Sequence, residues 1–129
     1  MYREEEEMPV QEGFPRIFEQ LKRILAAQAK GLTVKMDTPD TYYLDGPYSK
    51  KWKKELFFGS AQIKKNYVSF YLMPIYMYPE LLSDISPDLK KHMQGKSCFN
   101  FKKVEPALFQ ELEVLTRKGA EKFKQESEK

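Results

Sequence analysis

Apolar side chains recur every three or four positions between residues 14 and 30, which is the period of one face of an α-helix. The residues on this face are Phe14, Ile17, Phe18, Leu21, Ile24 and Leu25. Pro15 suits the first turn, where its missing backbone N–H is not needed, and Gly31 is a typical helix stop. We therefore predict an amphipathic helix from about Phe14 to Lys30.

Alternation replaces this helical period after Gly31. Leu32, Val34 and Met36 alternate with polar residues, which predicts a short strand. Pro39 breaks this strand, because proline cannot donate a hydrogen bond to a strand ladder. A second short strand follows over residues 41–46 and ends at Gly46-Pro47, a typical turn signal. Residues 48–55 are then interpreted as a polar, basic connection.

The clearest hairpin lies between residues 56 and 73. Its strands are predicted at residues 56–63 and 67–73, joined by a turn over residues 64–66 in which Asn66 can take a positive φ. Pro74 closes the second strand, and Tyr76 and Tyr78 fall in the loop that follows.

The remaining chain predicts short helical turns, a strand and a long helix. The short turns are placed at Pro79–Leu82 and Pro87–Met93, the second with Ser86 as N-cap. Alternation of Phe99 and Phe101 predicts a fifth strand. A stripe of apolar residues after Pro106 predicts a terminal amphipathic helix; the stripe consists of Leu108, Leu112, Leu115 and Phe123.

This order of elements predicts an α+β fold. Strands joined by tight turns favour a roughly five-stranded antiparallel sheet, with the N- and C-terminal helices packed on one face as a two-layer sandwich. The chain has 129 residues and shows no repeat and no Gly/Ser linker. We therefore expect residues 1–13 to form a flexible acidic tail and residues 14–125 to form a single domain.

Side chains alternate along a strand, so the pattern divides the sheet into two faces. The helix-covered face is predicted to hold Val34, Tyr42, Leu44, Phe57, Ala61, Ile63, Val68, Phe70, Leu72, Phe99 and Phe101. The opposite, open face is predicted to hold Lys35, Tyr43, Phe58, Ser60, Gln62, Tyr67, Ser69, Tyr71, Met73, Cys98, Asn100 and Lys102.

The open face mixes aromatic rings with hydroxyls, amides and lysines, which is typical of binding surfaces. From it we predict ligand or partner contacts by Tyr43, Phe58, Tyr71, Met73 and Asn100. Lys35 and Lys102 would favour an anion on this face.

Charge is distributed unevenly along the chain. The net charge is +3, but residues 1–13 hold one arginine against five glutamates, so the body of the chain is basic. The single Cys98 excludes an internal disulfide and fits a reducing compartment. We find no apolar run of membrane-spanning length and no hydrophobic signal segment, so we expect a cytoplasmic protein without a membrane partner.

No catalytic or metal-binding pattern stands out. Cys98 and His92 are the only thiol and the only imidazole, and their spacing matches no known local signature of a catalytic pair. A zinc site needs three or four Cys, His or carboxylate ligands. The glycines form no phosphate-binding loop. We therefore predict no catalytic residue, no resident metal and no cofactor.

The strand Tyr67–Leu72, the run from Gly95 to Phe101 and the terminal amphipathic helix together resemble the YdhG-like family, small bacterial domains of unknown function. The resemblance covers roughly residues 14–124. It implies a compact α+β domain, and some members are described as frataxin-like iron chaperones. Many members carry a tryptophan and a Met-Pro pair soon after the first helix. Residues 36–39 here read Met-Asp-Thr-Pro without that tryptophan, and no catalytic residue carries over.

These observations favour a non-enzymatic domain that binds a small ligand or a protein partner, including a second copy of itself, on the open face. Two alternatives remain open. The first is a metal chaperone that uses carboxylates of Glu4–Glu7, Glu12 and Glu19. The second is a weak binder of single-stranded nucleic acid through Trp52 and its neighbouring lysines, although the mild net charge and the missing RNA-recognition signature argue against it.

Overall fold

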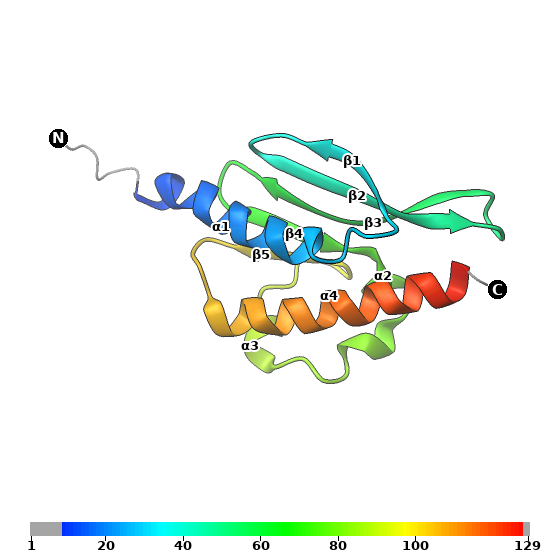
Figure 1. The fold of residues 1–129 in the computed structure, drawn as a ribbon. Helices are drawn as coiled ribbons and strands as arrows, with labels where there is room; N and C mark the ends of the chain where they lie inside the picture. Colours follow the sequence, from blue (N-terminus) through cyan, green and yellow to red (C-terminus); the bar gives the residue numbers. More distant parts are fainter. Residues whose placement is uncertain (1–8, 128–129) are drawn as a thin grey trace.

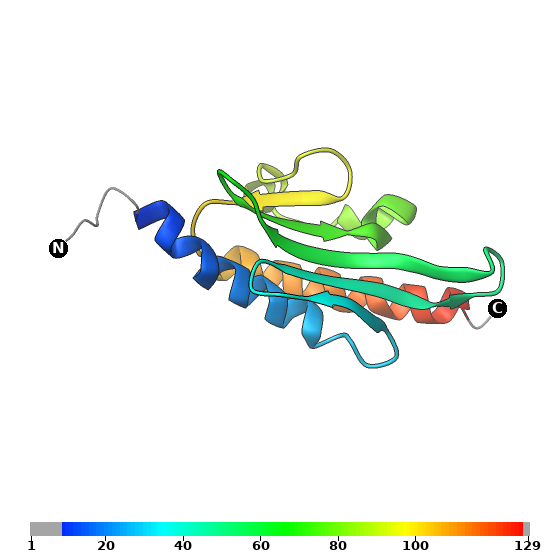
Figure 2. The same cartoon turned by 90° about the horizontal axis from the view of Figure 1, so that it is seen from above.

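Five antiparallel strands follow one another in chain order across one sheet in the computed structural model of the protein, which describes residues 9–127. The strands are β1 (Thr33–Asp37), β2 (Thr41–Ser49), β3 (Lys54–Ile63), β4 (Val68–Leu72) and β5 (Cys98–Phe101). Helices α1 (Pro9–Ala26) and α4 (Pro106–Ser127) lie on one face of the sheet (Figure 1). Seen from above, the opposite face is free of described helices (Figure 2). The predicted α+β architecture is therefore confirmed.

Helix α1 differs from its prediction at both ends. It begins at Pro9 and ends at Ala26, so Pro15 lies inside the helix and residues 9–13 of the predicted tail are helical. Residues 1–8 of that tail lie outside the described residues. After Ala26 the chain continues in turns, and Gly31 adopts a φ of 83°, a conformation that glycine takes without steric cost.

Strands β2 and β3 are longer than predicted, because β2 does not end at Gly46-Pro47 but continues to Ser49. The ladder between β2 and β3 shifts register between Asp45 and Tyr48, so the missing N–H of Pro47 falls in an irregular stretch. A Cβ at Gly46 would lie 2.6 Å from the ring of Phe123, so glycine there lets α4 approach the sheet closely. The predicted basic connection shrinks to residues 50–53, a second tight hairpin.

The hairpin between β3 and β4 is confirmed, with Ile63 opposite Val68 and Gly59 opposite Leu72. Its turn closes with the Lys64 N–H donating to the Tyr67 carbonyl at 2.8 Å. Asn66 does not take the positive φ that we expected. The one non-glycine residue with positive φ in the described chain is Lys53, at 60° in the turn between β2 and β3.

Short helices connect β4 to β5. They are α2 (Met73–Met77), the 3₁₀ helix η1 (Pro79–Leu82) and α3 (Pro87–Lys90). Helix α2 places Tyr76 in a helix rather than in the predicted loop. Ser86 caps α3 as predicted, since its Oγ accepts from the Leu89 N–H at 3.1 Å. The Asn100 N–H donates to the His92 carbonyl at 2.9 Å, so residues next to α3 line the outer edge of β5.

One apolar core lies between the sheet and the helices. Phe58, Phe70, Phe99 and Phe101 are fully buried from the sheet side. The apolar stripe of α1 and the predicted stripe of α4 supply the other side. The rings of Phe101 and Phe109 meet edge to face at 4.9 Å, which joins β5 directly to α4. This layer fixes the sheet, and with it the positions of the side chains on the open face.

Candidate functional site

A β-bulge in β3 decides which phenylalanine reaches the open face. Asp45 on β2 pairs with Phe57 and Leu44 pairs with Gly59, so Phe58 is an extra residue in β3. Phe58 is fully buried and meets the α4 ring of Phe123 edge to face at 5.5 Å. The predicted faces of Phe57 and Phe58 are therefore wrong: Phe57 lies on the open face and Phe58 in the core.

Four residues form a row across the open face, one from each strand from β2 to β5. Tyr43 pairs with Ser60, Ser60 with Tyr71, and Tyr71 with Cys98. Ser60 is completely buried although none of the described helices covers this face, and both of its strand neighbours are tyrosines. The row therefore has a small polar floor between larger aromatic side chains.

A neighbouring row carries a hydrogen-bonded polar network. The Ser69 hydroxyl donates to Asn100 Oδ1 at 2.7 Å, and the Cys98 thiol approaches the same oxygen at 3.4 Å. The amide of Gln62 donates to Ser60 Oγ at 3.1 Å. Because these contacts occupy Asn100 Oδ1, Asn100 has an ordered position on the face.

Cys98 is not placed to be activated by the imidazole of His92. Burial raises the pKa of the Cys98 thiol, and hydrogen bonds with Ser69 and Tyr71 only partly offset this effect. His92 stacks on the core ring of Phe101 at 4.6 Å, and its Nδ1 lies 2.9 Å from the Asn100 carbonyl. Cys98 and His92 thus belong to opposite sides of β5, which separates the two side chains that a thiol–imidazole pair would need.

At one end of the open face lies a groove, which we call the aromatic groove, with a volume of about 560 Å³. It is lined by Tyr43, Asp45, Trp52, Lys54, Glu55, Leu56, Phe57, Met73 and Met77. The rings of Tyr43 and Phe57 lie 4.7 Å apart with a tilt of 40°, so they form one continuous aromatic wall. The thioethers of Met73 and Met77 add adaptable apolar contacts to the lining.

Charged groups meet at the β1 side of this groove. Lys35 Nζ lies 3.4 Å from Glu55 and 4.0 Å from Asp45, and the Thr33 hydroxyl donates to Glu55 at 2.8 Å. The Thr33 hydrogen bond, together with Lys35, lowers the pKa of Glu55. Burial raises the pKa of Asp45 despite the nearby ammonium. Lys35 is therefore committed to two carboxylates and does not stand free for an anion.

Trp52 stands at the tip of the β2–β3 hairpin and is 56% exposed. Its backbone N–H donates to Ser49 Oγ at 3.2 Å, and the next N–H, of Lys53, donates to the Ser49 carbonyl at 2.7 Å. The positive φ of Lys53 is costly for a residue with a side chain and is held here by this turn. The turn thus presents a large aromatic ring to solvent in a defined position.

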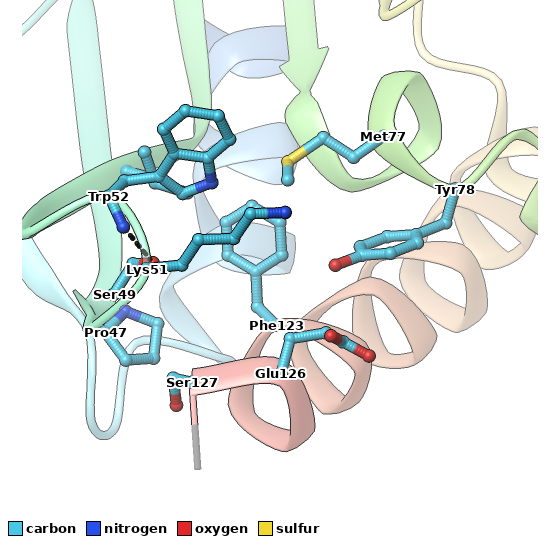
Figure 3. A pocket seen from close by; sticks show the side chains of 10 residues that line it. Pro47, Ser49, Lys51, Trp52, Met77, Tyr78, Phe123, Glu126 and Ser127 are labelled. Carbon is cyan, nitrogen blue, oxygen red and sulfur yellow. Dashed lines mark hydrogen bonds between the residues drawn. The ribbon is translucent and has the colours of Figure 1, made fainter. Parts of the chain in front are cut away.

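A second, smaller cavity of about 160 Å³ lies on the other side of the same hairpin (Figure 3). We call it the hairpin cavity. It is lined by Pro47, Ser49, Lys51, Trp52, Leu56, Met77, Tyr78, Phe123, Glu126 and Ser127. Trp52, Leu56 and Met77 line both the cavity and the groove, so the two sites share a wall.

The structure brings together only some of the predicted contact residues. Tyr43 and Met73 share the aromatic groove, and Tyr71 and Asn100 belong to the rows next to it. Lys102 is exposed past the end of β5 and lines neither cavity.

Several lining residues were missed. Phe57 was assigned to the wrong face, Trp52 was considered only for nucleic acid, and Met77 was not considered. Gly59 was an available signal, because a glycine within a strand often marks a bulge. Nothing in the local pattern indicates that α2 would bring Met77 against the hairpin tip.

Among the side chains that the structure describes, no group of three or more His, Cys, Asp or Glu is placed to hold a metal ion. No helix in the described part of the chain is long and apolar enough to cross a membrane. Of the carboxylates predicted for a metal chaperone, Glu4–Glu7 lie outside the described residues.

Comparison with known proteins gives no relative: no protein-family model, no curated protein and no solved structure matches this chain.

Proposed function

We propose that this chain is a non-enzymatic binding domain of the YdhG-like type that its sequence resembles, and that it holds a small ligand with a flat apolar part in the aromatic groove. The observation that carries the proposal is the paired wall of Tyr43 and Phe57 in a groove of about 560 Å³. Small-molecule sites typically have volumes of roughly 300–1,000 Å³ and apolar, aromatic linings with a few polar groups.

The polar groups of the groove support a ligand with a polar end. Asp45, Glu55 and Lys54 all line the groove, while its other contacts are aromatic, aliphatic or thioether. Apolar surface supplies affinity here, and the charged groups at one side fix the orientation of the ligand. Trp52, as an exposed ring in an ordered turn, closes the hairpin end of the groove.

A titration with 1-anilinonaphthalene-8-sulfonate, a probe that joins a naphthalene to a phenyl ring, tests this proposal. Trp52 is the only tryptophan and lines both the groove and the hairpin cavity, so its fluorescence reports binding at either, and the Tyr43 variant assigns the signal to the groove. We expect saturable binding to the folded protein and a loss of about tenfold in affinity for Tyr43→Ala, as for an aromatic contact residue. Tyr76→Ala removes a tyrosine that is 55% exposed and lines neither cavity, so it is the matched control.

Equal affinity for wild type and Tyr43→Ala would contradict the groove as the site. A protein partner on the same face gives a different result. Light scattering that shows a dimer of the wild type and a monomer of Tyr71→Arg would assign the face to a second copy of the chain, since Tyr71 lies at its centre.

One observation favours a second candidate, the binding of single-stranded nucleic acid. Lys51 Nζ lies 5.3 Å from the ring centre of the exposed Trp52, and Lys50, Lys53 and Lys54 flank it. Exposed aromatic rings among basic groups are the means by which such proteins stack bases and follow phosphates. The test is a titration with oligothymidylate. Binding that weakens steeply with salt and is lost when the four lysines become alanine would favour this candidate over the first.

A further inference from the structure

The hairpin cavity differs from the aromatic groove in shape and in chemistry. Its floor is apolar and comes from three elements: Leu56 on β3, Met77 on α2 and Phe123 on α4. The side chains of Trp52 and Tyr78 stand on opposite sides of the hollow, with Phe123 between and below them (Figure 3). Aromatic rings thus surround this small space on three sides.

The polar groups of the cavity leave one cation available. Lys51 contacts the Trp52 ring at 5.3 Å, and the ion pairs of the described residues do not include it. Glu126, which also lines the cavity, lies 3.9 Å from the ammonium of Lys122. Burial raises the pKa of Tyr78, so its hydroxyl keeps its proton and can donate. Two ammonium groups, of Lys51 and Lys122, and one carboxylate, of Glu126, therefore lie at or beside the cavity, and Lys51 is in no ion pair of the described residues.

The size of the cavity limits the ligand to about one ring. Its volume of about 160 Å³ is close to that of an apolar cavity of roughly 150 Å³ that accommodates a benzene molecule. We propose that the hairpin cavity is a second binding site, separate from the aromatic groove, for a single-ring aromatic carboxylate. Its ring lies against Phe123, Trp52 and Tyr78, and its carboxylate meets the ammonium of Lys51.

The local structure supports a preformed site. The Ser49 hydroxyl accepts from the Trp52 N–H, and Lys53 holds the left-handed conformation that closes the turn. Tyr78 follows α2, and its N–H donates to the Pro74 carbonyl at 2.7 Å. Preorganised walls lower the entropic cost of binding a small ligand.

The test compares three probes of similar size: phenylacetate, benzyl alcohol and benzylamine. Trp52 fluorescence measures their affinities, and amide chemical shifts locate them on the full chain. We expect phenylacetate to bind most tightly, and Lys51→Met to weaken it about tenfold, as for the loss of a charged hydrogen bond. Lys50→Met changes the same charge at a neighbouring residue outside the cavity and should leave the affinity unchanged, while Lys51→Arg should preserve most of it.

The proposal would be overturned if benzylamine or benzyl alcohol bound as tightly as phenylacetate, or if phenylacetate failed to saturate the protein at millimolar concentration. Tyr43→Ala separates this site from the aromatic groove, because Tyr43 lines only the groove. If Tyr43→Ala weakens phenylacetate as much as Lys51→Met does, the probe occupies the groove and the hairpin cavity is not its site. If Lys51→Met binds 1-anilinonaphthalene-8-sulfonate as tightly as the wild type does, the aromatic groove binds its ligand independently of the hairpin cavity.

Discussion

Phe57 and Phe58 are neighbours in β3 that point to opposite faces of the sheet, Phe58 into the core against Phe123 and Phe57 onto the open face against Tyr43. The bulge opposite Leu44 and Asp45 on the partner strand sets this arrangement. One inserted residue thus gives the aromatic groove a ring that simple alternation would have buried.

The two phenylalanines should therefore respond very differently to truncation. Phe58→Ala removes a fully buried ring and should lower the free energy of unfolding by about 3–5 kcal/mol. Phe57→Ala removes a half-buried ring and its contact with Tyr43, which should cost only about 1 kcal/mol. Urea denaturation of both variants measures these values. A larger loss for Phe57→Ala than for Phe58→Ala would mean that β3 is not bulged at this point.

The same bulge shows where prediction from the sequence succeeds and where it fails. Features that depend on patterns extending over many residues can be predicted from the sequence. The apolar stripe of α1 and the β3–β4 hairpin are two such features. Alternation identifies faces only while a strand is regular, so one extra residue exchanges Phe57 and Phe58. The pair Gly46-Pro47 predicts a strand end, although an irregular stretch of the ladder accommodates Pro47 within β2. Cavities formed by α2, α4 and the hairpin tip depend on tertiary contacts that no local pattern encodes.

Gly59 supplies a test of the close approach between β3 and β4. A Cβ there would lie 2.8 Å from the Tyr71 carbonyl oxygen and 3.0 Å from Leu25 Cδ2. The first neighbour is backbone of the paired strand and cannot move away easily, so Gly59→Ala should destabilise the protein by about 1–3 kcal/mol.

Gly13→Ala is the matched control for this substitution. Gly13 lies in α1, and a methyl group added to it would meet no other part of the described chain within 4 Å, so alanine should stabilise the helix by about 0.5–1 kcal/mol. Thermal melting of both variants shows whether each substitution raises or lowers the melting temperature. A Gly59→Ala protein as stable as wild type would contradict the close approach of β3 and β4.

Thr116 on α4 carries a hydroxyl that is completely buried and has no hydrogen-bond partner among the described residues. Such a group loses its hydration on folding without compensation, so Thr116→Val, which keeps the shape, should stabilise the protein by about 1 kcal/mol or more. Thr116→Ser keeps the hydroxyl and removes a methyl group, so it should destabilise by about 1 kcal/mol. Chemical denaturation of both variants and of the wild type shows whether the free energy of unfolding is highest for Thr116→Val and lowest for Thr116→Ser. A less stable Thr116→Val protein would show that the hydroxyl has a partner.

Cys98 should be a slow nucleophile in the folded protein. Its thiol lies in the row with Tyr71, and burial raises its pKa, so less thiolate is present at a given pH than in an unfolded chain. Alkylation by iodoacetamide at about pH 8.5, the ordinary range of cysteine, should therefore be slower for native than for denatured protein. The midpoint of the native rate against pH should be displaced upward.

The raised pKa of Cys98 also makes the stability of the folded protein depend on pH. The native state keeps the Cys98 proton at pH values where the unfolded chain has lost it. The corresponding stabilisation is fully present below the ordinary cysteine pKa and is lost as pH rises through the higher native pKa. The difference in unfolding free energy between wild type and Cys98→Ala should accordingly fall as the pH rises above the ordinary cysteine pKa of about 8.5. Taking this difference cancels the titration of the tyrosines and lysines that both proteins share. A native alkylation midpoint at or below the ordinary value would mean a stabilised thiolate, and it would place a reactive nucleophile on the open face beside Tyr71.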